Sequence, residues 1–261
     1  MTEFETLYFD IEGVKTALNV AGEGEPVLFL HGASTLEGFD LFSRLGSKFQ
    51  MLMPAHPGMG LSGDAPHINC MGDLVLHYLN LLDALELPCR PHLIGFSMGG
   101  WLATELAAVA RERFGRIVLV APAGLQDADH PFRDLATIPP QEFPSYLAHD
   151  AAVALQYFPD GSDPDAAARF SAARLREAEL VSRLCQPFGM GHPNLAICMR
   201  RITNPTLLVW GAEDRILPCS LARLWLENLP NAYLVSVADA GHLVLQEKPE
   251  TLCRISDFLS L

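Results

Sequence analysis

The sequence predicts an α/β protein in which a mostly parallel central sheet is flanked by helices. Short apolar runs alternate with longer segments of helical period, as is typical of parallel strands joined by crossover helices. Several of the apolar runs are continuous rather than alternating, as expected for strands that are buried on both faces. This rhythm stops between residues 125 and 203, which predicts a helical insertion into the fold.

The first half of the chain contains six predicted strands and two long helices. An antiparallel hairpin is expected at its start, with a turn at Glu12-Gly13. The first long helix is expected over residues 69–86, with Asn69 as its N-cap, and the second over residues 98–112. The strands are predicted at residues 6–20, which form the hairpin, and at 26–32, 50–55, 91–97 and 116–124.

Residues 125–203 contain no clear strand, several prolines and an amphipathic stretch at 163–184. A connection of roughly 75 residues is far longer than an ordinary loop, and insertions of this size are commonly lids over a functional site. We therefore predict a helical cap over 125–203, inserted after the sixth core strand of a domain formed by residues 1–124 and 204–261. The second half of that domain is expected to contain strands at 205–211 and 232–241, a helix at 220–229 and a last helix from Pro249.

The composition is typical of a globular protein, and the substrate expected from the site residues below is a small molecule. The chain has 261 residues, of which 49% are hydrophobic, enough to bury a large core. A net charge of −13 argues against nucleic acid or an anionic membrane as the main partner. The first residues include acids where a secretory signal would be basic, no apolar run is long enough to span a membrane, and the six cysteines lack C-x-x-C spacing. We therefore expect reduced thiols and a cytoplasmic location.

Ser97 lies where a predicted buried strand meets a predicted helix, between Gly95 and Gly99 in the stretch GFSMG. The pattern G-x-S-x-G is weak by itself, because a chain of this length contains it by chance about one time in ten. A glycine-rich turn with an incidental serine would also explain it. The position is more informative, since a strained strand-to-helix turn exposes the hydroxyl at the carboxyl edge of the sheet, where such sheets bind ligands. Ser97 is therefore the candidate nucleophile.

A serine nucleophile needs a base and an acid that orients the base. His242 follows the last predicted strand and a glycine, which places it at the same sheet edge as Ser97. Asp214 follows the preceding strand and is the preferred acid. Glu213 is adjacent to it, and Asp239 is closer to His242 in sequence but near the end of the strand. Solvated loop residues are the alternative interpretation of each.

The remaining site residues are expected to bind the substrate. The backbone N–H groups of Ala33 and Met98 are the predicted oxyanion hole, because His31-Gly32 ends a strand and Met98 follows the nucleophile. His31 itself is expected to be structural. No metal ion or organic cofactor is required by this set of residues. Candidate pocket-lining residues are Ser34, Phe132, Leu135 and Leu243, although Phe132 and Leu135 could instead be buried in the core of the cap.

Several blocks of the sequence resemble the α/β-hydrolase superfamily, in its serine-nucleophile branch with a helical cap. These blocks are HGAS (31–34), HPGMGLS (56–62), GFSMGGW (95–101), PTLLVWGAEDRILP (205–218) and AGHLVLQEKPE (240–250). The resemblance covers nearly the whole chain and implies that Ser97, Asp214 and His242 form a catalytic triad. It argues against haloalkane dehalogenases and epoxide hydrolases, which have Asp at the position of Ser97.

The function predicted from these residues is hydrolysis of a small to medium, largely apolar carboxylic ester. The alternative within catalysis is hydrolysis of a C–C bond in ring-fission products, with the same triad. The resemblance supports this alternative less well, because those hydrolases have a glycine-rich H-G-S-G-P-G loop and a Trp after the catalytic His, where this chain has HGAS and Leu243. An iminopeptidase would need acidic cap residues, for which Asp127, Asp129, Asp134 and Glu142 are available. A ligand receptor with an intact triad is the non-enzymatic alternative.

Overall fold

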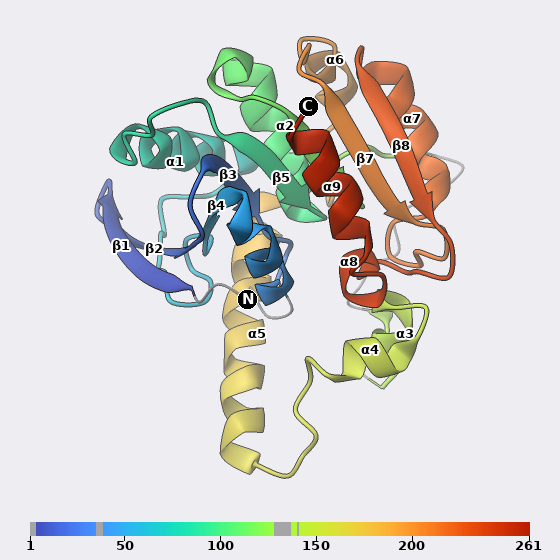
Figure 1. Ribbon diagram of the computed structural model, residues 1–261. Coiled ribbons are helices and arrows are strands. Elements are labelled where there is room, and N and C mark those ends of the chain that lie inside the picture. The colour runs from blue at the N-terminus through green and yellow to red at the C-terminus, as the bar shows by residue number, and fades with distance from the viewer. Residues whose placement is uncertain (1–3, 35–38, 128–136, 140) are drawn as a thin grey trace.

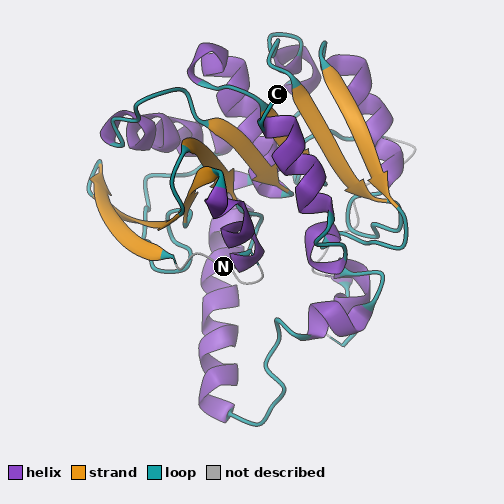
Figure 2. Cartoon of the chain, viewed as in Figure 1, coloured by secondary structure: helices purple, strands orange, loops and turns teal. Residues whose placement is uncertain are grey.

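The strands of the protein form one twisted sheet with helices on both faces (Figures 1 and 2). The computed structural model describes residues 4–34, 39–127, 137–139 and 141–261, so the predicted pocket residues Phe132 and Leu135 lie outside the described residues. In the described part of the chain the sheet has eight strands in the order β1-β2-β4-β3-β5-β6-β7-β8. The strands are β1 (Glu5–Ile11), β2 (Val14–Ala21), β3 (Glu25–Leu30), β4 (Phe49–Pro54), β5 (His92–Phe96), β6 (Ile117–Val120), β7 (Thr206–Gly211) and β8 (Ala232–Val237).

The sheet is parallel from β4 to β8 and antiparallel at the β1–β2 edge. The predicted hairpin turn is confirmed, because Glu12 and Gly13 connect β1 to β2 with φ values of 50° and 80°. Positive φ at both central residues matches the twist of a two-residue hairpin.

The helices in the described part of the chain are η1 (Asp40–Ser47), α1 (Met71–Ala84), α2 (Met98–Ala110), η2 (Arg111–Arg113), α3 (Phe143–Leu147), α4 (Ala151–Leu155), α5 (Pro164–Leu184), α6 (Leu195–Met199), η4 (Cys219–Leu221), α7 (Ala222–Asn228), α8 (Val244–Glu247) and α9 (Thr251–Leu259).

Several predicted boundaries differ from the structure, and three of them have a local reason. The strand β6 ends at Val120 rather than at residue 124, because Ala121 has a φ of 41° and the extended backbone cannot continue through it. The strand β8 ends at Val237 rather than at 241, two residues before Asp239, which has a φ of 52°. The helix α1 has Cys70 at its N-cap instead of Asn69, whose N–H donates to the Asp73 carboxylate at 2.9 Å.

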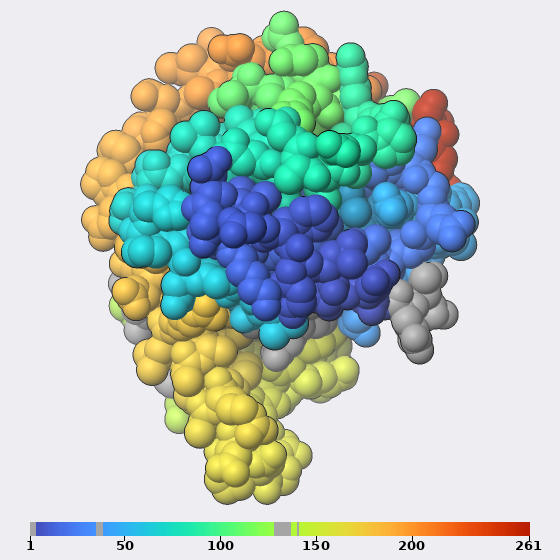
Figure 3. All heavy atoms as spheres, turned by 90° about the vertical axis from the view of Figure 1, so that its left-hand side faces the viewer, coloured from blue at the N-terminus to red at the C-terminus, as the bar shows by residue number. Residues whose placement is uncertain are grey.

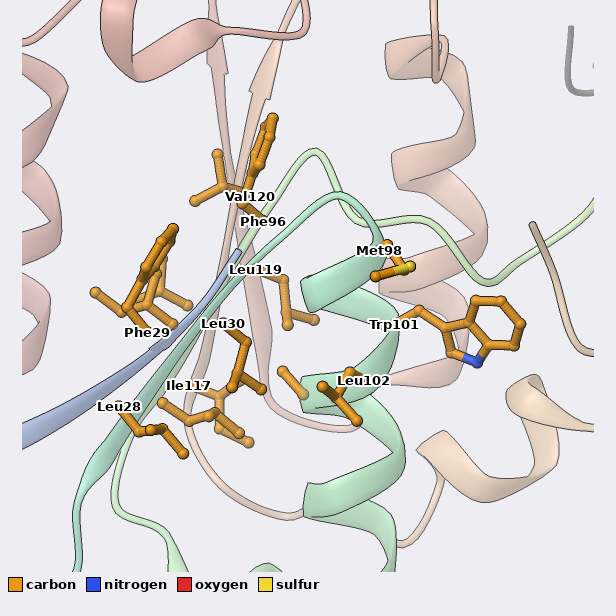
Figure 4. Packing of buried hydrophobic residues seen from close by; sticks show 14 of the residues in the cluster. Leu28, Phe29, Leu30, Phe96, Met98, Trp101, Leu102, Ile117, Leu119 and Val120 are labelled. Atoms are coloured by element: carbon orange, nitrogen blue, oxygen red, sulfur yellow. The ribbon is translucent and has the colours of Figure 1, made fainter. Parts of the chain in front are cut away.

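The core lies on both faces of β3, β5 and β6, as the continuous apolar runs predict. Figure 4 shows Leu30 of β3 and Leu119 of β6 between the strands and Leu102 of α2. Phe29 extends to the opposite face, where its ring centroid lies 4.5 Å from that of Phe42 in η1. Because successive strand residues point to opposite faces, this burial on both sides holds the central strands rigidly between two helical layers.

The insertion between β6 and β7 contains α3, α4, α5 and α6 among its described residues. The helix α5 begins after Asp163, whose carboxylate accepts hydrogen bonds from the N–H groups of Asp165 and Ala166 as an N-cap. Its N-terminal part projects from the body of the molecule, and its C-terminal part lies against the core (Figures 1 and 3). There Arg176 donates to the Asp64 carboxylate at 2.7 Å. In the part of the chain that the structure describes, no helix combines the length and the apolar character that crossing a bilayer requires.

Candidate active site

The turn between β5 and α2 holds Ser97 in a strained backbone conformation. Its φ of 54° and ψ of −119° lie in a region that non-glycine residues rarely adopt, at a cost on the order of 1–3 kcal/mol. Hydrogen bonds hold it there: the Ser97 N–H donates to Val120 O at 3.0 Å, and its carbonyl accepts from the N–H groups of Gly100 and Ala123, each at 2.9 Å. The turn therefore presents the hydroxyl at the carboxyl end of the central strand β5, as the motif predicts.

The two glycines of the motif are required because α2 packs directly on the backbone of the sheet. A Cβ on Gly99 would lie 2.1 Å from the carbonyl oxygen of Leu30 in β3. A Cβ on Gly95 would lie 2.4 Å from the carbonyl oxygen of Gly99. Since both obstacles are main-chain atoms, no side-chain rotation can remove them.

We expect Gly99→Ala to destabilise the protein by about 2 kcal/mol or more, because the added methyl group forces α2 away from β3. Gly72→Ala is the matched control, since Gly72 is also the second residue of a helix and a Cβ there would meet only the Cys70 Sγ, at 3.7 Å. In a helix, alanine is favoured over glycine by roughly 0.5–1 kcal/mol, so this control should not lose stability. Urea unfolding measures both free energies, and equal stability of the two variants would contradict the packing described here.

Three predicted residues from distant parts of the chain meet at the carboxyl edge of the sheet. His242 Nε2 lies 3.0 Å from Ser97 Oγ, and His242 Nδ1 lies 2.8 Å from Asp214 Oδ2. All three residues are buried, with 6% or less of their surface exposed. The hydroxyl, imidazole and carboxylate thus form one continuous line of hydrogen bonds shielded from bulk water.

The loop after β7 fixes which carboxylate faces the histidine. Asp214 Oδ1 accepts hydrogen bonds from the N–H groups of Ile216 and Leu217, both at 2.8 Å, and this leaves Oδ2 directed at the imidazole. The neighbouring alternatives, Glu213 and Asp239, have exposed side chains. The geometry therefore selects Asp214 as the partner of His242.

The loop after β3 lies against the serine. A Cβ on Gly32 would lie 3.3 Å from Ser97 Cβ, so the backbone directly before Ala33 packs against the Ser97 side chain. Met98 is the first residue of α2, where N–H groups have no acceptor within the helix. Of the predicted pocket residues, Ser34 is exposed in this same loop, and Leu243 is half-buried beside His242.

A buried histidine pair beneath the loop was not predicted to shape the site. The His56 N–H donates to His31 Nε2 at 3.0 Å, so His31 carries its proton on Nδ1, which donates to the carbonyls of Gly32 and Ser34 at 2.9 and 2.8 Å. His56 Nε2 in turn donates to His31 O, and its Nδ1 accepts from the Tyr78 hydroxyl. Sequence motifs contained both histidines, but only their pairing shows that they hold the turn at Gly32.

Burial keeps this network neutral. It lowers the pKa of His31 to about 4, and burial together with the repulsion that two protonated rings would feel lowers the pKa of His56 well below its ordinary value. Burial also raises the pKa of the Tyr78 hydroxyl well above its ordinary value. A neutral imidazole has one donor nitrogen and one acceptor nitrogen. In His31 and in His56 both nitrogens make hydrogen bonds, so these bonds hold the loop at neutral pH.

The helix α5 of the insertion brings a partly buried ion pair towards the same loop. Arg174 Nη2 lies 2.9 Å from Glu177 Oε2, and Glu177 is only 2% exposed. The positive charge of Arg174 is close enough to contribute to the lowered pKa of His31. Within the described residues, no group of three or more His, Cys, Asp or Glu side chains is arranged to hold a metal ion.

Comparison with known proteins agrees with this architecture. Residues 27–255 match the model of the alpha/beta hydrolase family. The chain is 28% identical over 269 residues to 2-hydroxymuconate semialdehyde hydrolase of Pseudomonas putida, covering 95% of this chain and 92% of that protein. It is also 28% identical over 258 residues to pimeloyl-[acyl-carrier protein] methyl ester esterase of Nitrosomonas europaea, covering 93% and 98%.

A solved structure has the same fold. The meta-cleavage product hydrolase from Pseudomonas fluorescens IP01 superposes with a TM-score of 0.81 over 97% of each chain, at 21% sequence identity. The match to the family model spans the sheet from β3 to β8 and includes the elbow at Ser97 and the loops of Asp214 and His242. This chain therefore belongs to the alpha/beta hydrolase family.

Proposed function

We propose that this protein is a serine hydrolase that cleaves a small to medium, largely apolar carboxylic ester through an acyl-enzyme. The observation that carries the proposal is the line of contacts from Ser97 Oγ to His242 Nε2 (3.0 Å) and from His242 Nδ1 to Asp214 Oδ2 (2.8 Å). A serine hydroxyl is a weak nucleophile at neutral pH and needs a base in this position. The similarity to a methyl ester esterase supports an ester as the substrate.

In the first step Ser97 Oγ attacks the acyl carbon, and its proton passes to His242 Nε2. Asp214 holds the imidazole in the correct tautomer and stabilises its charged form. The N–H groups of Ala33 and Met98 would bind the oxyanion of the tetrahedral intermediate, each contributing about 3 kcal/mol. The carbon–oxygen bond of the ester then breaks, and His242 donates the proton to the leaving alcohol.

In the second step water attacks the acyl carbon of the acyl-enzyme, and His242 accepts a proton from that water. The bond between the acyl carbon and Ser97 Oγ breaks, the proton returns to Oγ, and the carboxylic acid leaves. All groups that move protons in this cycle belong to the chain itself, so no step requires a metal ion or organic cofactor.

We also propose that residues 125–203 act as a cap that selects the substrate over a core of residues 1–124 and 204–261. This division is supported by the contacts of the insertion with the site, since Leu243 donates its N–H to Leu147 O of α3 at 2.8 Å. In this proposal Ser34 and Leu243 line the entrance on the core side. Phe132 and Leu135 are proposed as the cap side of the pocket.

A second reaction is favoured by one comparison, because a relative of equal identity is 2-hydroxymuconate semialdehyde hydrolase. Hydrolysis of a C–C bond would use the same three residues. Both reactions are tested by assaying p-nitrophenyl esters of increasing acyl length beside a ring-fission dienoate. We expect turnover of short and medium esters with kcat/KM above that for the dienoate. A higher kcat/KM for the dienoate would assign the C–C reaction, and failure on both substrates would contradict the proposal.

A further inference from the structure

The carboxylate of Glu247 joins two segments that are far apart in sequence. Its Oε2 accepts a hydrogen bond from the Gly241 N–H at 2.6 Å, immediately before His242. Its Oε1 accepts one from the Asp150 N–H at 2.8 Å, at the N-cap of α4 in the insertion. Glu247 ends the short helix α8 and is half-buried. One side chain thus holds both the insertion and the loop that contains Gly241 and His242, which we call the histidine loop.

The histidine loop is confined between the sheet and the insertion at this point. A Cβ on Gly241 would lie 2.7 Å from the backbone nitrogen of His149 in the insertion. On the other side, a Cβ on Gly211 at the end of β7 would lie 2.1 Å from the carbonyl oxygen of Gly241. Main-chain atoms of the insertion and of β7 therefore lie close to Gly241 on two sides, with no room for a side chain between them.

Two more hydrogen bonds link the same part of the insertion to the loops of the site. Leu243, on the other side of His242, donates its N–H to Leu147 O at 2.8 Å. Arg215, which follows Asp214, donates from Nη1 to Ser145 O at 3.4 Å. We name residues 143–155, which include α3 and α4, the α3–α4 segment. Of these links, the one through Glu247 differs because the same charged side chain also accepts a hydrogen bond from the histidine loop.

We infer that Glu247 is a positioning residue that clamps the α3–α4 segment to the histidine loop and thereby aligns His242 between Ser97 and Asp214. The inference rests on the proposed function, in which the alignment of His242 determines the rate of acyl transfer. The α3–α4 segment then supports the active site as a fixed part of it. We therefore expect substrate to enter without opening this clamp, because opening it would release His242 from its alignment.

The chemistry of the clamp specifies informative variants. A carboxylate offers an acceptor oxygen to each N–H, and such charge-assisted bonds are stronger than neutral ones. Glu247→Gln keeps a single carbonyl oxygen, so one of the two N–H groups would face an NH₂ group instead. Glu247→Ala removes both acceptors. Glu250→Gln is the matched control, because it makes the same charge change on an exposed side chain three residues further along.

Amide hydrogen exchange tests the clamp without requiring any activity. In Glu247→Ala we expect the Gly241 and Asp150 amides to exchange on the order of tenfold faster, since each loses a charged acceptor. Glu247→Gln should accelerate one of the two, and Glu250→Gln neither. Unchanged exchange at both amides in Glu247→Ala would overturn the clamp.

Kinetics test the alignment of His242. We expect kcat for a p-nitrophenyl ester and the rate of Ser97 labelling by an organophosphonate to fall together, by about 10- to 100-fold in Glu247→Ala and less in Glu247→Gln. KM should stay within about twofold, because the substrate contacts are not altered. Faster exchange with unchanged labelling would overturn the positioning role. A wild-type protein that neither labels nor turns over esters would refute the proposed function and that role with it, while the exchange measurement still decides the clamp.

Discussion

Ser97→Ala is expected to lower kcat for a p-nitrophenyl ester by about 10⁵- to 10⁶-fold, because the variant has no atom to form the acyl-enzyme. Asp214→Asn should cost about 10⁴-fold, since the amide does not hold His242 in the tautomer whose Nε2 accepts the serine proton. His242 Nε2 lies 3.0 Å from Ser97 Oγ, so the hydroxyl and base act as one unit. A Ser97/Asp214 double variant should therefore be no worse than Ser97→Ala alone.

The control for this experiment is Ser220→Ala, an exposed serine in the short helix η4 outside the triad. It should retain wild-type kinetics and bind one organophosphonate per chain, whereas Ser97→Ala should bind none. Circular dichroism would establish that each variant is folded. Residual activity of Ser97→Ala within about tenfold of wild type would exclude Ser97 as the nucleophile.

Acidification is expected to destabilise the protein between about pH 6.5 and 4, through histidines that are buried in the neutral form. Burial lowers the pKa of both His31 and His77 to about 4 and that of His56 well below 6.5. The unfolded chain gains protons as the pH falls through 6.5, but the folded chain does not until the pH approaches 4. Stability is therefore complete above 6.5 and declines below it, by about 3 kcal/mol at pH 4 for His31 alone.

The slope of the unfolding free energy against pH isolates this effect. His77 Nε2 lies within hydrogen-bond distance of Thr16 Oγ1, at 3.2 Å, a contact that Gln can replace without titrating. His77→Gln should therefore reduce the slope at pH 5 by about 1.4 kcal/mol per pH unit, the contribution of one proton. His149→Gln, at an exposed position, is the matched control and should leave most of the slope intact. Urea unfolding at several pH values measures both, and identical slopes for the two variants would contradict the prediction.

Much of the fold and the triad could be predicted, because the sequence signals for them, apolar runs and glycines at strand ends, extend over only a few residues. Continuous apolar runs identified β3 and β5, and the carboxyl ends of parallel strands necessarily share one edge. That rule alone brings Ser97, Asp214 and His242 to the same side of the sheet. The strand ends were predicted less well, since apolar composition continues past Val120, whereas the extended backbone does not.

Other features depend on contacts between distant residues and could not be predicted. The orientation of the Asp214 carboxylate was decided by the N–H groups of Ile216 and Leu217, which leave Oδ2 directed at His242. The contact between the rings of His31 and His56, with centroids 3.8 Å apart, joins residues from different loops. The contact of Glu247 with Asp150 spans 97 positions of the chain, and no periodicity or motif records such a pair.

The sequence by itself thus determined the class of fold, the edge of the sheet that carries the chemistry, and the three residue types placed there. These follow from hydrophobic periodicity and from glycines at strand ends, which act over a few residues. The tertiary structure decided the hydrogen-bonded line through His242, the neutral histidine pair beneath the loop at Gly32, and the attachment of the α3–α4 segment. Hydrogen bonds are sensitive to shifts of a few tenths of an ångström, and only the packing of the whole chain defines positions that closely.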